Sequence, residues 1–261
     1  MNNPLKPFSF SLRQAFRVWQ REVSVYKYVY KSTIISNLMD PLIYLMALGF
    51  GLGAYVNRMQ GLPYIQFIAP GLISSSIMTA ATFETTINTF VRIHFDRIYE
   101  AMMATPVTVE DIAVGEMMWA MTRSTIYATV MLGVVTVLGL TRSWYAIFVP
   151  LMGALGGLMF ATLGLTYTSF LKSIDQVNFY MTLFITPLFL FSGVFYPIDA
   201  LPQIVKTIAF LSPLYHLVEV VRPLVLGTVG YGILIHLGWI LAFVFIFTVL
   251  PVNLLRRKLV K

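Results

Sequence analysis

The sequence contains no cysteine, and only 11% of its 261 residues are charged. The absence of cysteine excludes disulfides, thiolate metal sites and cysteine nucleophiles. The low charge excludes a water-soluble globule, because soluble domains carry about 25% charged residues. The sequence also lacks the P-loop pattern G-x-x-x-x-G-K-[ST], the H-E-x-x-H zinc motif and the G-x-S-x-G nucleophile motif. We therefore expect no catalytic residues, no metal site and no cofactor in this chain.

Apolar residues make up 58% of the chain and recur in runs of about 20, which is enough to cross a hydrocarbon core of about 30 Å as helix. In lipid each spanning segment must satisfy its own backbone polar groups, and the runs are too long for barrel strands. The sequence therefore predicts an all-α polytopic membrane protein. We expect six transmembrane helices, at about 33–56, 64–91, 117–140, 145–170, 179–196 and 231–252.

Residues 1–31 precede the first predicted span and contain no signal-peptide hydrophobic region. Apolar and aromatic side chains recur here every three or four positions, at Phe8, Leu12, Phe16, Trp19, Val23, Tyr26 and Tyr30. Most basic residues of the segment lie off this stripe, a pattern that is typical of an amphipathic helix in the headgroup plane. Such a helix transmits movement into the first span or serves as a topological anchor, and both roles are compatible.

Lysine and arginine are unevenly distributed between the two predicted sides. With both termini inside, thirteen of the eighteen fall on the inner side, four fall outside and Arg123 lies within a span. The positive-inside rule then predicts cytoplasmic N and C termini. The net charge of +7 needs no nucleic-acid partner when it lies mostly on the cytoplasmic face of a membrane.

The second predicted span is unusually polar. Its small hydroxyl residues include Ser75, Thr79, Thr82 and Thr86, and Glu84 lies among them. An acid at membrane depth is costly unless it is paired or hydrated. Glu84 therefore lines a translocation path or a subunit interface, or it pairs with Arg123 in the third span.

A polar stretch, residues 92–115, separates the second and third predicted spans. Ile93, Arg97, Glu100 and Ala104 recur there at helical spacing, and Thr105-Pro106 breaks the pattern. Asp111 stands at the start of the next apolar run, where it can cap that helix. The stretch is a short helix-turn at the membrane surface or an ordinary polar loop.

Between the fifth and sixth predicted spans, no apolar run is long enough to cross a bilayer. Two short helices that dip into the outer leaflet as a re-entrant hairpin, about 199–226, fit this stretch better. Glu219 and Arg222 are three residues apart and can neutralise one another. His216 is a proton-carrying or metal-binding group or, more ordinarily, a polar interfacial residue, since the three histidines fall in different segments.

The run RIYEAMMATPVTVEDIAVGEMMWA resembles the cytoplasmic loop of ABC-2 type permeases. Four further stretches are similar to the same family in the same order: DPLIYLMALGFGLG, YIQFIAPGLISSSIMTAATFE, SGVFYPIDALP and LSPLYHLVEVVRPLVLG. The resemblance covers nearly the whole chain. It is most similar to the NodJ-like branch, which serves lipo-oligosaccharide export, and to the related daunorubicin-type drug exporters.

That resemblance implies the permease subunit of an ABC exporter in the inner membrane of a bacterium. Two copies would form a homodimer and pair with two copies of a separate ATPase, which would bind ATP and magnesium. Residues 1–31 would form a cytoplasmic tail and interfacial helix, and residues 32–261 the ABC-2 transmembrane domain. The re-entrant hairpin, with Glu219 and Arg222, would cap the pathway externally.

The same resemblance places a coupling helix at about 96–105 and a substrate path between the two copies. The implied ATPase contacts are Asp96, Arg97, Glu100, Met102, Met103 and Thr105, supported by Glu110, Asp111 and Glu116. The path would run along spans one, two and five. Its expected lining residues are Ser75, Thr79, Thr82, Glu84 and Thr86.

The expected substrate is an amphipathic molecule: a lipid, a lipo-oligosaccharide or a lipid-linked glycan. A hydrophobic drug is the main alternative within the same class of exporter. A secondary transporter or channel without an ATPase would show several buried acids and an internal hydropathy repeat, whereas only Glu84 lies deep. A membrane scaffold without transport activity is a third class, against which the polar second span argues mildly.

Overall fold

The computed structural model describes residues 10–56 and 58–259, and within them the regular structure is helical apart from one isolated bridge between Met59 and Leu62. Five helices in this part are long and apolar enough to cross a membrane: Leu12–Ala54, Tyr64–His94, Val109–Val137, Trp144–Phe170 and Gly232–Leu259. A bent pair, α9 (Gln203–Phe210) and α10 (Pro213–Leu226), makes a sixth if its two helices count as one span. The chain is therefore an all-helical polytopic membrane protein. Phe8 of the predicted stripe and the outer ends of the two predicted domains lie outside the described residues.

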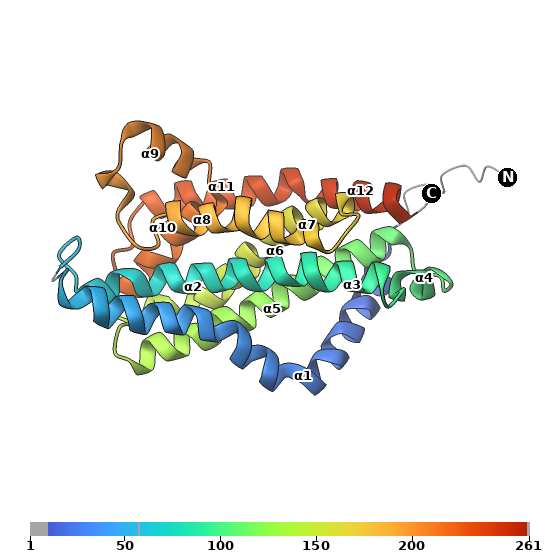
Figure 1. Cartoon of the computed structure of the whole chain (residues 1–261), viewed down its shortest axis with the longest axis horizontal. Coiled ribbons are helices and arrows are strands. Elements are labelled where there is room, and N and C mark those ends of the chain that lie inside the picture. Colours follow the sequence, from blue (N-terminus) through green and yellow to red (C-terminus); the bar gives the residue numbers. More distant parts are fainter. Residues whose placement is uncertain (1–9, 57, 260–261) are drawn as a thin grey trace.

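The first helix runs without interruption through the predicted boundary at residue 31. It comprises α1 (Leu12–Met46), the π-turn η1 (Ala47–Gly51) and the 3₁₀ turn η2 (Leu52–Ala54). Neither glycine nor proline occurs in α1 before Pro41, so nothing in the sequence stops the helix there. Figure 1 shows α1 bending strongly and then running alongside α2 (Tyr64–Phe83).

Only part of the apolar stripe of the N-terminal segment faces the bundle. Leu12 and Phe16 are exposed, whereas Ala15, Val18 and Glu22 on the neighbouring face are buried. Trp19 and Tyr26 of the stripe are half-buried and contact α5: Trp19 Nε1 donates to Thr122 Oγ1 at 2.9 Å, and the Tyr26 ring meets the Trp119 ring edge-on. The stripe therefore packs on α5 in its middle and is exposed at Leu12, Phe16 and Tyr30.

The second helix lies at the centre of the bundle. It consists of α2, the π-turn η3 (Glu84–Asn88) and α3 (Thr89–His94), and it packs against α1, α5 (Val109–Val137), α6 (Val149–Phe170) and α10. Nearly all of α2 is buried. Its many serine and threonine residues are small, which allows close approach, and their hydroxyls can donate to the preceding turn of the same helix.

The helix α5 begins well before the predicted third span. Thr108 is its N-cap and forms a capping box with Asp111: the hydroxyl of Thr108 accepts from Asp111 N at 3.2 Å, and the Asp111 carboxylate accepts from Thr108 N at 3.0 Å. The predicted capping role of Asp111 is thus confirmed in part: Thr108 is the N-cap, and Asp111, the third helical residue, completes the capping box. A short 3₁₀ helix, η4 (Trp144–Phe148), then leads into α6.

Small residues let α6 approach α5 and η3 closely. A Cβ at Gly157 would lie 2.6 Å from the Ser124 side chain, and one at Gly164 would lie 2.0 Å from Thr85 Oγ1. Thr168 Oγ1 donates to Thr85 O at 2.7 Å. These contacts fix the C-terminal half of α6 against η3.

The remaining helices flank the core. The helix predicted as span 179–196 is built from α7 (Asp175–Tyr180), η5 (Met181–Ile185) and α8 (Thr186–Phe191), and the chain turns at Gly193, whose φ is 76°. A short 3₁₀ helix, η6 (Ile198–Ala200), precedes α9 and α10. The last two helices are α11 (Gly232–Phe247) and α12 (Val249–Leu259).

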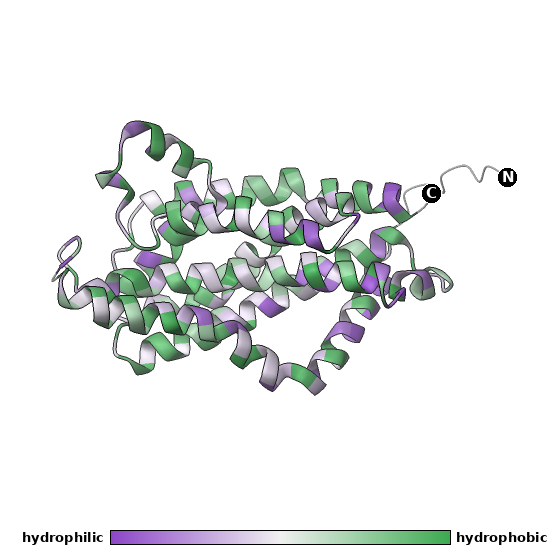
Figure 2. Ribbon diagram, viewed as in Figure 1, coloured by the Kyte–Doolittle hydropathy of each residue, from purple (hydrophilic) through white to green (hydrophobic). Residues whose placement is uncertain are grey.

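The helix α4 (Ile98–Met103) and the helix α9 mark opposite ends of the bundle, which we call the α4 end and the α9 end (Figure 1). The main hydrophobic core surrounds α2, and a second core at the α4 end joins α1, α3, α4, α5, α6 and α12. Hydrophilic residues gather at the α4 end and along the N-terminal part of α1, whereas the long helices are mostly hydrophobic (Figure 2).

Candidate functional site

The predicted coupling segment forms α4, which is shorter than the predicted 96–105. Arg97 precedes it in the left-handed conformation, with φ of 49°. Asp96, Arg97, Glu100 and Thr105 are exposed. Met102 and Met103 are half-buried, and they pack against the second core. The segment therefore presents a polar outer face, and its apolar side attaches it to the bundle.

Beside α4 lies a buried charge cluster, which we define as Glu22, Glu84, Arg92, Glu116 and Arg123. Arg92 on α3 is its centre. The two terminal nitrogens of Arg92 lie 2.7 Å from Glu22 Oε2, 2.5 Å from Glu84 Oε1 and 2.6 Å from Glu116 Oε2. One side chain thus binds carboxylates from α1, η3 and α5.

Arg123 completes the charge cluster from α5. It forms an ion pair with Glu84, whose Oε2 also accepts a hydrogen bond from Asn88 Nδ2 at 2.9 Å. Arg21, at the edge of the cluster, pairs with Glu22. Counting Arg21, three carboxylates face three guanidinium groups, and the cluster is electrically balanced.

The burial of these charges decides what the cluster can do. The side chains of Glu22, Glu84 and Glu116 are only 2%, 1% and 0% exposed. Removing one partner from such a buried pair costs about 3–5 kcal/mol, since it leaves an uncompensated charge. The arrangement therefore holds α1, η3, α3 and α5 in one relative position, and any movement of α3 must exchange or break ion pairs.

The structure shows one of the alternatives for Glu84, the pairing with Arg123. The sequence did not indicate its second partner, Arg92, or the participation of Glu22. Glu22 is the only acid before Asp40, and it stands three residues after Trp19 on the predicted stripe. This single acid, one helical turn from the stripe, was the feature of the sequence that could have indicated a buried ion pair. The assignment of Glu84 to a substrate path stays a prediction.

The three predicted supporting residues are buried and already have partners in the chain. Glu110 lies 3.3 Å from Arg256 of α12, which ties the C-terminal helix to α5. Asp111 accepts hydrogen bonds from the capping box and from Ser11 N at 2.7 Å. Glu116 belongs to the charge cluster. None of the three offers an exposed surface in this conformation, and their supporting role in coupling stays a prediction.

Tyr99 connects α4 to the charge cluster. It is the fully buried residue of α4, and its hydroxyl has no hydrogen-bond partner among the described residues. Burial, together with the neighbouring Glu116 carboxylate, raises the pKa of the Tyr99 hydroxyl above its usual range. Tyr99 therefore places an aromatic side chain of α4 beside the charge cluster.

The predicted path residues on α2 and η3 lie inside the chain. Ser75, Thr82 and Thr86 are buried, and Thr79 is half-buried. The hydroxyls of Ser75, Thr79 and Thr86 donate to carbonyls of their own helix at 2.9, 2.9 and 2.7 Å. In the described conformation this hydroxyl face contributes to helix packing.

At the α9 end the expected pair is present: Arg222 Nη1 lies 3.1 Å from Glu219 Oε1. Arg222 also donates to Gly193 O at 2.6 Å, and its guanidinium lies 4.3 Å from the centre of the Phe67 ring. These contacts fix α10 against α2 and against the turn after α8.

The expectation that His216 has no histidine partner is wrong. It is buried, its Nδ1 lies 2.9 Å from Nδ1 of His236, and its Nε2 lies 2.7 Å from Phe210 O. The α9–α10 corner packs on α11, and this brings together two histidines from segments that are separate in the sequence. Within the described residues, no group of three or more histidine, aspartate or glutamate side chains could hold a metal ion.

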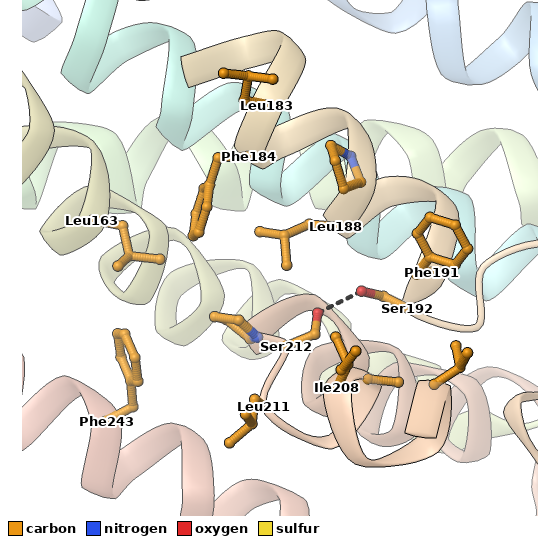
Figure 3. A pocket seen from close by; sticks show the side chains of 14 residues that line it. Leu163, Leu183, Phe184, Leu188, Phe191, Ser192, Ile208, Leu211, Ser212 and Phe243 are labelled. Atoms are coloured by element: carbon orange, nitrogen blue, oxygen red, sulfur yellow. Dashed lines mark hydrogen bonds between the residues drawn. The ribbon is translucent and has the colours of Figure 1, made fainter. Parts of the chain in front are cut away.

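An apolar cavity of about 570 Å³ lies between α6, α8, α9, the start of α10 and α11. Figure 3 shows Leu188, Phe191 and Ile208 among the side chains around it, with Phe243 from α11 on another side. The hydrogen bond between Ser192 and Ser212, at 2.5 Å, is one of the few polar features of the lining. The cavity can hold hydrocarbon, but it offers little to recognise a polar group.

The sequence is similar to a known family of membrane proteins over most of its length. Residues 13–226 match the family described as ABC-2 type transporter. A nodulation protein J of Rhizobium leguminosarum bv. viciae is 40% identical over 245 residues, 94% of each chain. One from Rhizobium meliloti (strain 1021) is 39% identical over 243 residues, 93% of this chain and 92% of the relative. An inner membrane transport permease, YadH of Escherichia coli K12, is 25% identical over 243 residues, 92% of this chain and 93% of the relative.

The long apolar helices define a multi-pass membrane protein. The chain belongs to the ABC-2 type transporter family. It is a transport permease that contains no ATPase domain, and membership of this family implies a partner ABC ATPase subunit.

Proposed function

We propose that the chain is the permease of an ATP-driven exporter for an amphipathic molecule, a lipid-linked saccharide or a lipo-oligosaccharide. The observation that carries this proposal is the extended similarity to nodulation protein J, at 40% identity over 94% of the chain. The apolar cavity of about 570 Å³ supports it, because it provides a surface for an acyl chain beside the bent α9–α10 pair. A hydrophobic drug would use the same cavity and is the second candidate.

The proposed topology has six spans with both termini in the cytoplasm of a bacterium. The helix α7–α8 is the fifth span, and α9–α10 is a re-entrant hairpin in the outer leaflet. Two observations support this topology: the 86° bend between α9 and α10, and the basic residues in the last turn of α12. The N-terminal half of α1, with exposed Leu12 and Phe16, is the interfacial helix.

In this topology the α4 end faces the ATPase. Two copies of the chain pair with two ATPase subunits, which bind ATP and magnesium. The exposed Asp96, Arg97, Glu100 and Thr105 make the polar contacts, and the edges of Met102 and Met103 complete the surface. When nucleotide binding draws the ATPase subunits together, α4 moves, and Tyr99 and Arg92 carry that movement to the buried charge cluster.

The hydroxyl face of α2 lines the path in the proposed transport cycle only after neighbouring helices separate. In the described conformation Ser75, Thr82, Glu84 and Thr86 are buried, and Thr79 is the half-buried member. A path along this face therefore requires the charge cluster to rearrange, which links its opening to the movement of α4.

The proposal is tested by ATP hydrolysis of the reconstituted permease–ATPase complex in liposomes. A long-chain alkyl oligosaccharide is expected to stimulate hydrolysis, and tetraphenylphosphonium, a hydrophobic cation, is not. Stimulation by the cation alone would favour the drug exporter. If neither probe stimulated hydrolysis and neither probe were exported, the result would contradict both the saccharide exporter and the drug exporter.

A further inference from the structure

A second cavity, of about 240 Å³, lies at the α9 end and differs in chemistry from the apolar one. Its walls come from the loop before α2, from η6 with the residue before it, and from one face of α10 with the turn that follows. Its polar lining residues are Gln60, Asp199, Tyr215, Glu219, Arg222 and Thr228. Within the described part of the chain this cavity combines carboxylate, guanidinium, phenol, amide and hydroxyl groups.

The polar groups of the cavity are held in place, but some of their hydrogen-bond donors and acceptors have no partner within the described residues. Arg222 is fixed by Glu219, by Gly193 O and by the Phe67 ring, and its side chain is only 11% exposed, yet its buried Nε has no hydrogen-bond partner within the described residues. Glu219 accepts from Arg222 through Oε1, and its side chain is 32% exposed. Asp199 is exposed and has no ion-pair partner in the described part of the chain. Arg222, Glu219 and Asp199 can therefore still form hydrogen bonds with a ligand, and Arg222 is fixed in position.

The charge of the cavity limits what it can bind. Two carboxylates and one guanidinium leave it with a net charge of about −1 at neutral pH, which disfavours phosphate and carboxylate ligands. Carboxylates accept hydrogen bonds from hydroxyl groups, while Arg222 and Gln60 can donate. Pro197, Pro223 and Leu226 add apolar surface that suits the C–H face of a sugar ring.

We propose that this cavity is a binding site for a neutral glycosyl group on the exit side of the permease. It is small beside the usual range of about 300–1,000 Å³ for drug-sized pockets, so it accepts about one sugar ring. The α9–α10 pair contributes to both cavities, with Ile208 and Ser212 in the apolar one and Tyr215 and Glu219 in the polar one. The inference rests on the proposed function, and it assigns the head group and the hydrocarbon of one amphipathic substrate to opposite parts of the hairpin.

The test uses the full chain in phosphatidylcholine nanodiscs, without the ATPase, and saturation-transfer NMR with three probes: cellobiose, glucose 6-phosphate and glucosamine. Cellobiose is expected to show saturation transfer, and glucose 6-phosphate is not. Asp199→Asn should weaken cellobiose binding about tenfold, because it removes a charged hydrogen-bond acceptor. Tyr215→Phe is the second variant, and it should also weaken cellobiose binding, because it removes the phenol hydroxyl from the cavity lining. Neither change should affect folding, since Asp199 is exposed and the hydroxyl of Tyr215 is not part of the core.

The matched control is Thr207→Ala on α9, an exposed residue outside the cavity. It should leave cellobiose binding unchanged. Equal binding in wild type, Asp199→Asn and Tyr215→Phe would overturn the assignment, and so would binding of glucose 6-phosphate or glucosamine alone. Such a result would leave the exporter function standing, because the measurement involves neither the ATPase nor transport. A permease that binds cellobiose but shows no ATP-driven export would leave the sugar site standing and would contradict the exporter function.

Discussion

Arg92 of α3 and Glu22 of α1 form a buried ion pair, with Nη2 of Arg92 2.7 Å from Oε2 of Glu22. The segment that leads into α4 is thereby bound directly to the N-terminal half of α1. Arg92 also holds Glu84 and Glu116. The segment that leads into the proposed coupling helix and the proposed interfacial helix are thus joined at one guanidinium, and a force on either reaches η3 and α5.

The charge cluster predicts an order of effects. Glu84→Gln leaves both Arg92 and Arg123 without one partner, so it should lower the free energy of unfolding by about 3–5 kcal/mol. Arg123→Gln should cost less, since Glu84 keeps Arg92. The measurement is thermal unfolding of purified variants in one detergent, with exposed Glu100→Gln as the control. If Arg123→Gln were the more damaging change, Glu84 would not be the shared partner.

A simple exchange of the two charges should fail to restore stability. The double variant Glu84→Arg, Arg123→Glu re-forms one pair, but it places the introduced guanidinium of position 84 beside Arg92. Like charges at that separation repel one another in a buried site. Thermal unfolding of the double variant and of both single variants measures the effect. Full recovery of stability in the double variant would show that Arg92 does not depend on Glu84.

The close approach of α6 and η3 can be tested at a single glycine. Gly164→Ala would place a Cβ 2.0 Å from Thr85 Oγ1, whereas a Cβ at Gly133 on α5 meets nothing within 4 Å. Overpacking of this kind costs about 1–3 kcal/mol, so Gly164→Ala should unfold at lower temperature and Gly133→Ala should not. Equal unfolding temperatures for the two variants would contradict the tight contact.

Tyr99 predicts how stability depends on alkaline pH. Burial raises its pKa in the folded chain, so the unfolded chain, with a tyrosine pKa of about 10, loses this proton first. The contribution to stability is therefore complete below about pH 10 and decreases as the pH rises from there toward the folded-state pKa. Tyr99→Phe should reduce the loss of stability between neutral and strongly alkaline pH, and the exposed Tyr231→Phe should not. Thermal unfolding across this range measures both, and parallel curves for wild type and Tyr99→Phe would contradict the buried position.

The absence of cysteine makes the topology directly measurable. Single cysteines introduced at the exposed positions Glu100 in α4 and Thr207 in α9 are the only thiols in their variants. In intact cells a membrane-impermeant maleimide should label Thr207→Cys, whereas Glu100→Cys should react only after permeabilisation. Labelling of both in intact cells, or of Glu100→Cys alone, would contradict cytoplasmic placement of the α4 end.

The apolar runs predict the long helices because length and hydropathy depend on local sequence alone. The continuity of α1 through residue 31 also follows from local sequence, since neither glycine nor proline intervenes before Pro41. The charge cluster was predictable only in part. Glu84 and Arg123 attract attention as charges within apolar runs, but Arg92 and Glu22 stand in polar surroundings, and only the tertiary fold buries them.

The polar second span shows the limit of reading function from composition. Ser75, Thr82 and Thr86 suggest a hydrated path, yet Ser75 and Thr86 satisfy their hydroxyls on their own helix, and α2 belongs to the most enclosed of the candidate spans. Small polar residues serve close packing as well as transport, and sequence alone does not separate the two roles. The same holds for His216 and His236, whose contact depends on how α10 packs against α11.

The most direct measurement is purification of the tagged permease from its native membrane in mild detergent, with quantification of any P-loop ATPase that co-purifies. An ATPase in about equal amount is expected for wild type and for Lys206→Glu at the α9 end. It should be lost when Arg97→Glu and Glu100→Lys are combined on the exposed face of α4. An ATPase that stays bound to the α4 variant, or a wild-type permease that carries none under conditions that preserve other ABC complexes, would contradict coupling through α4.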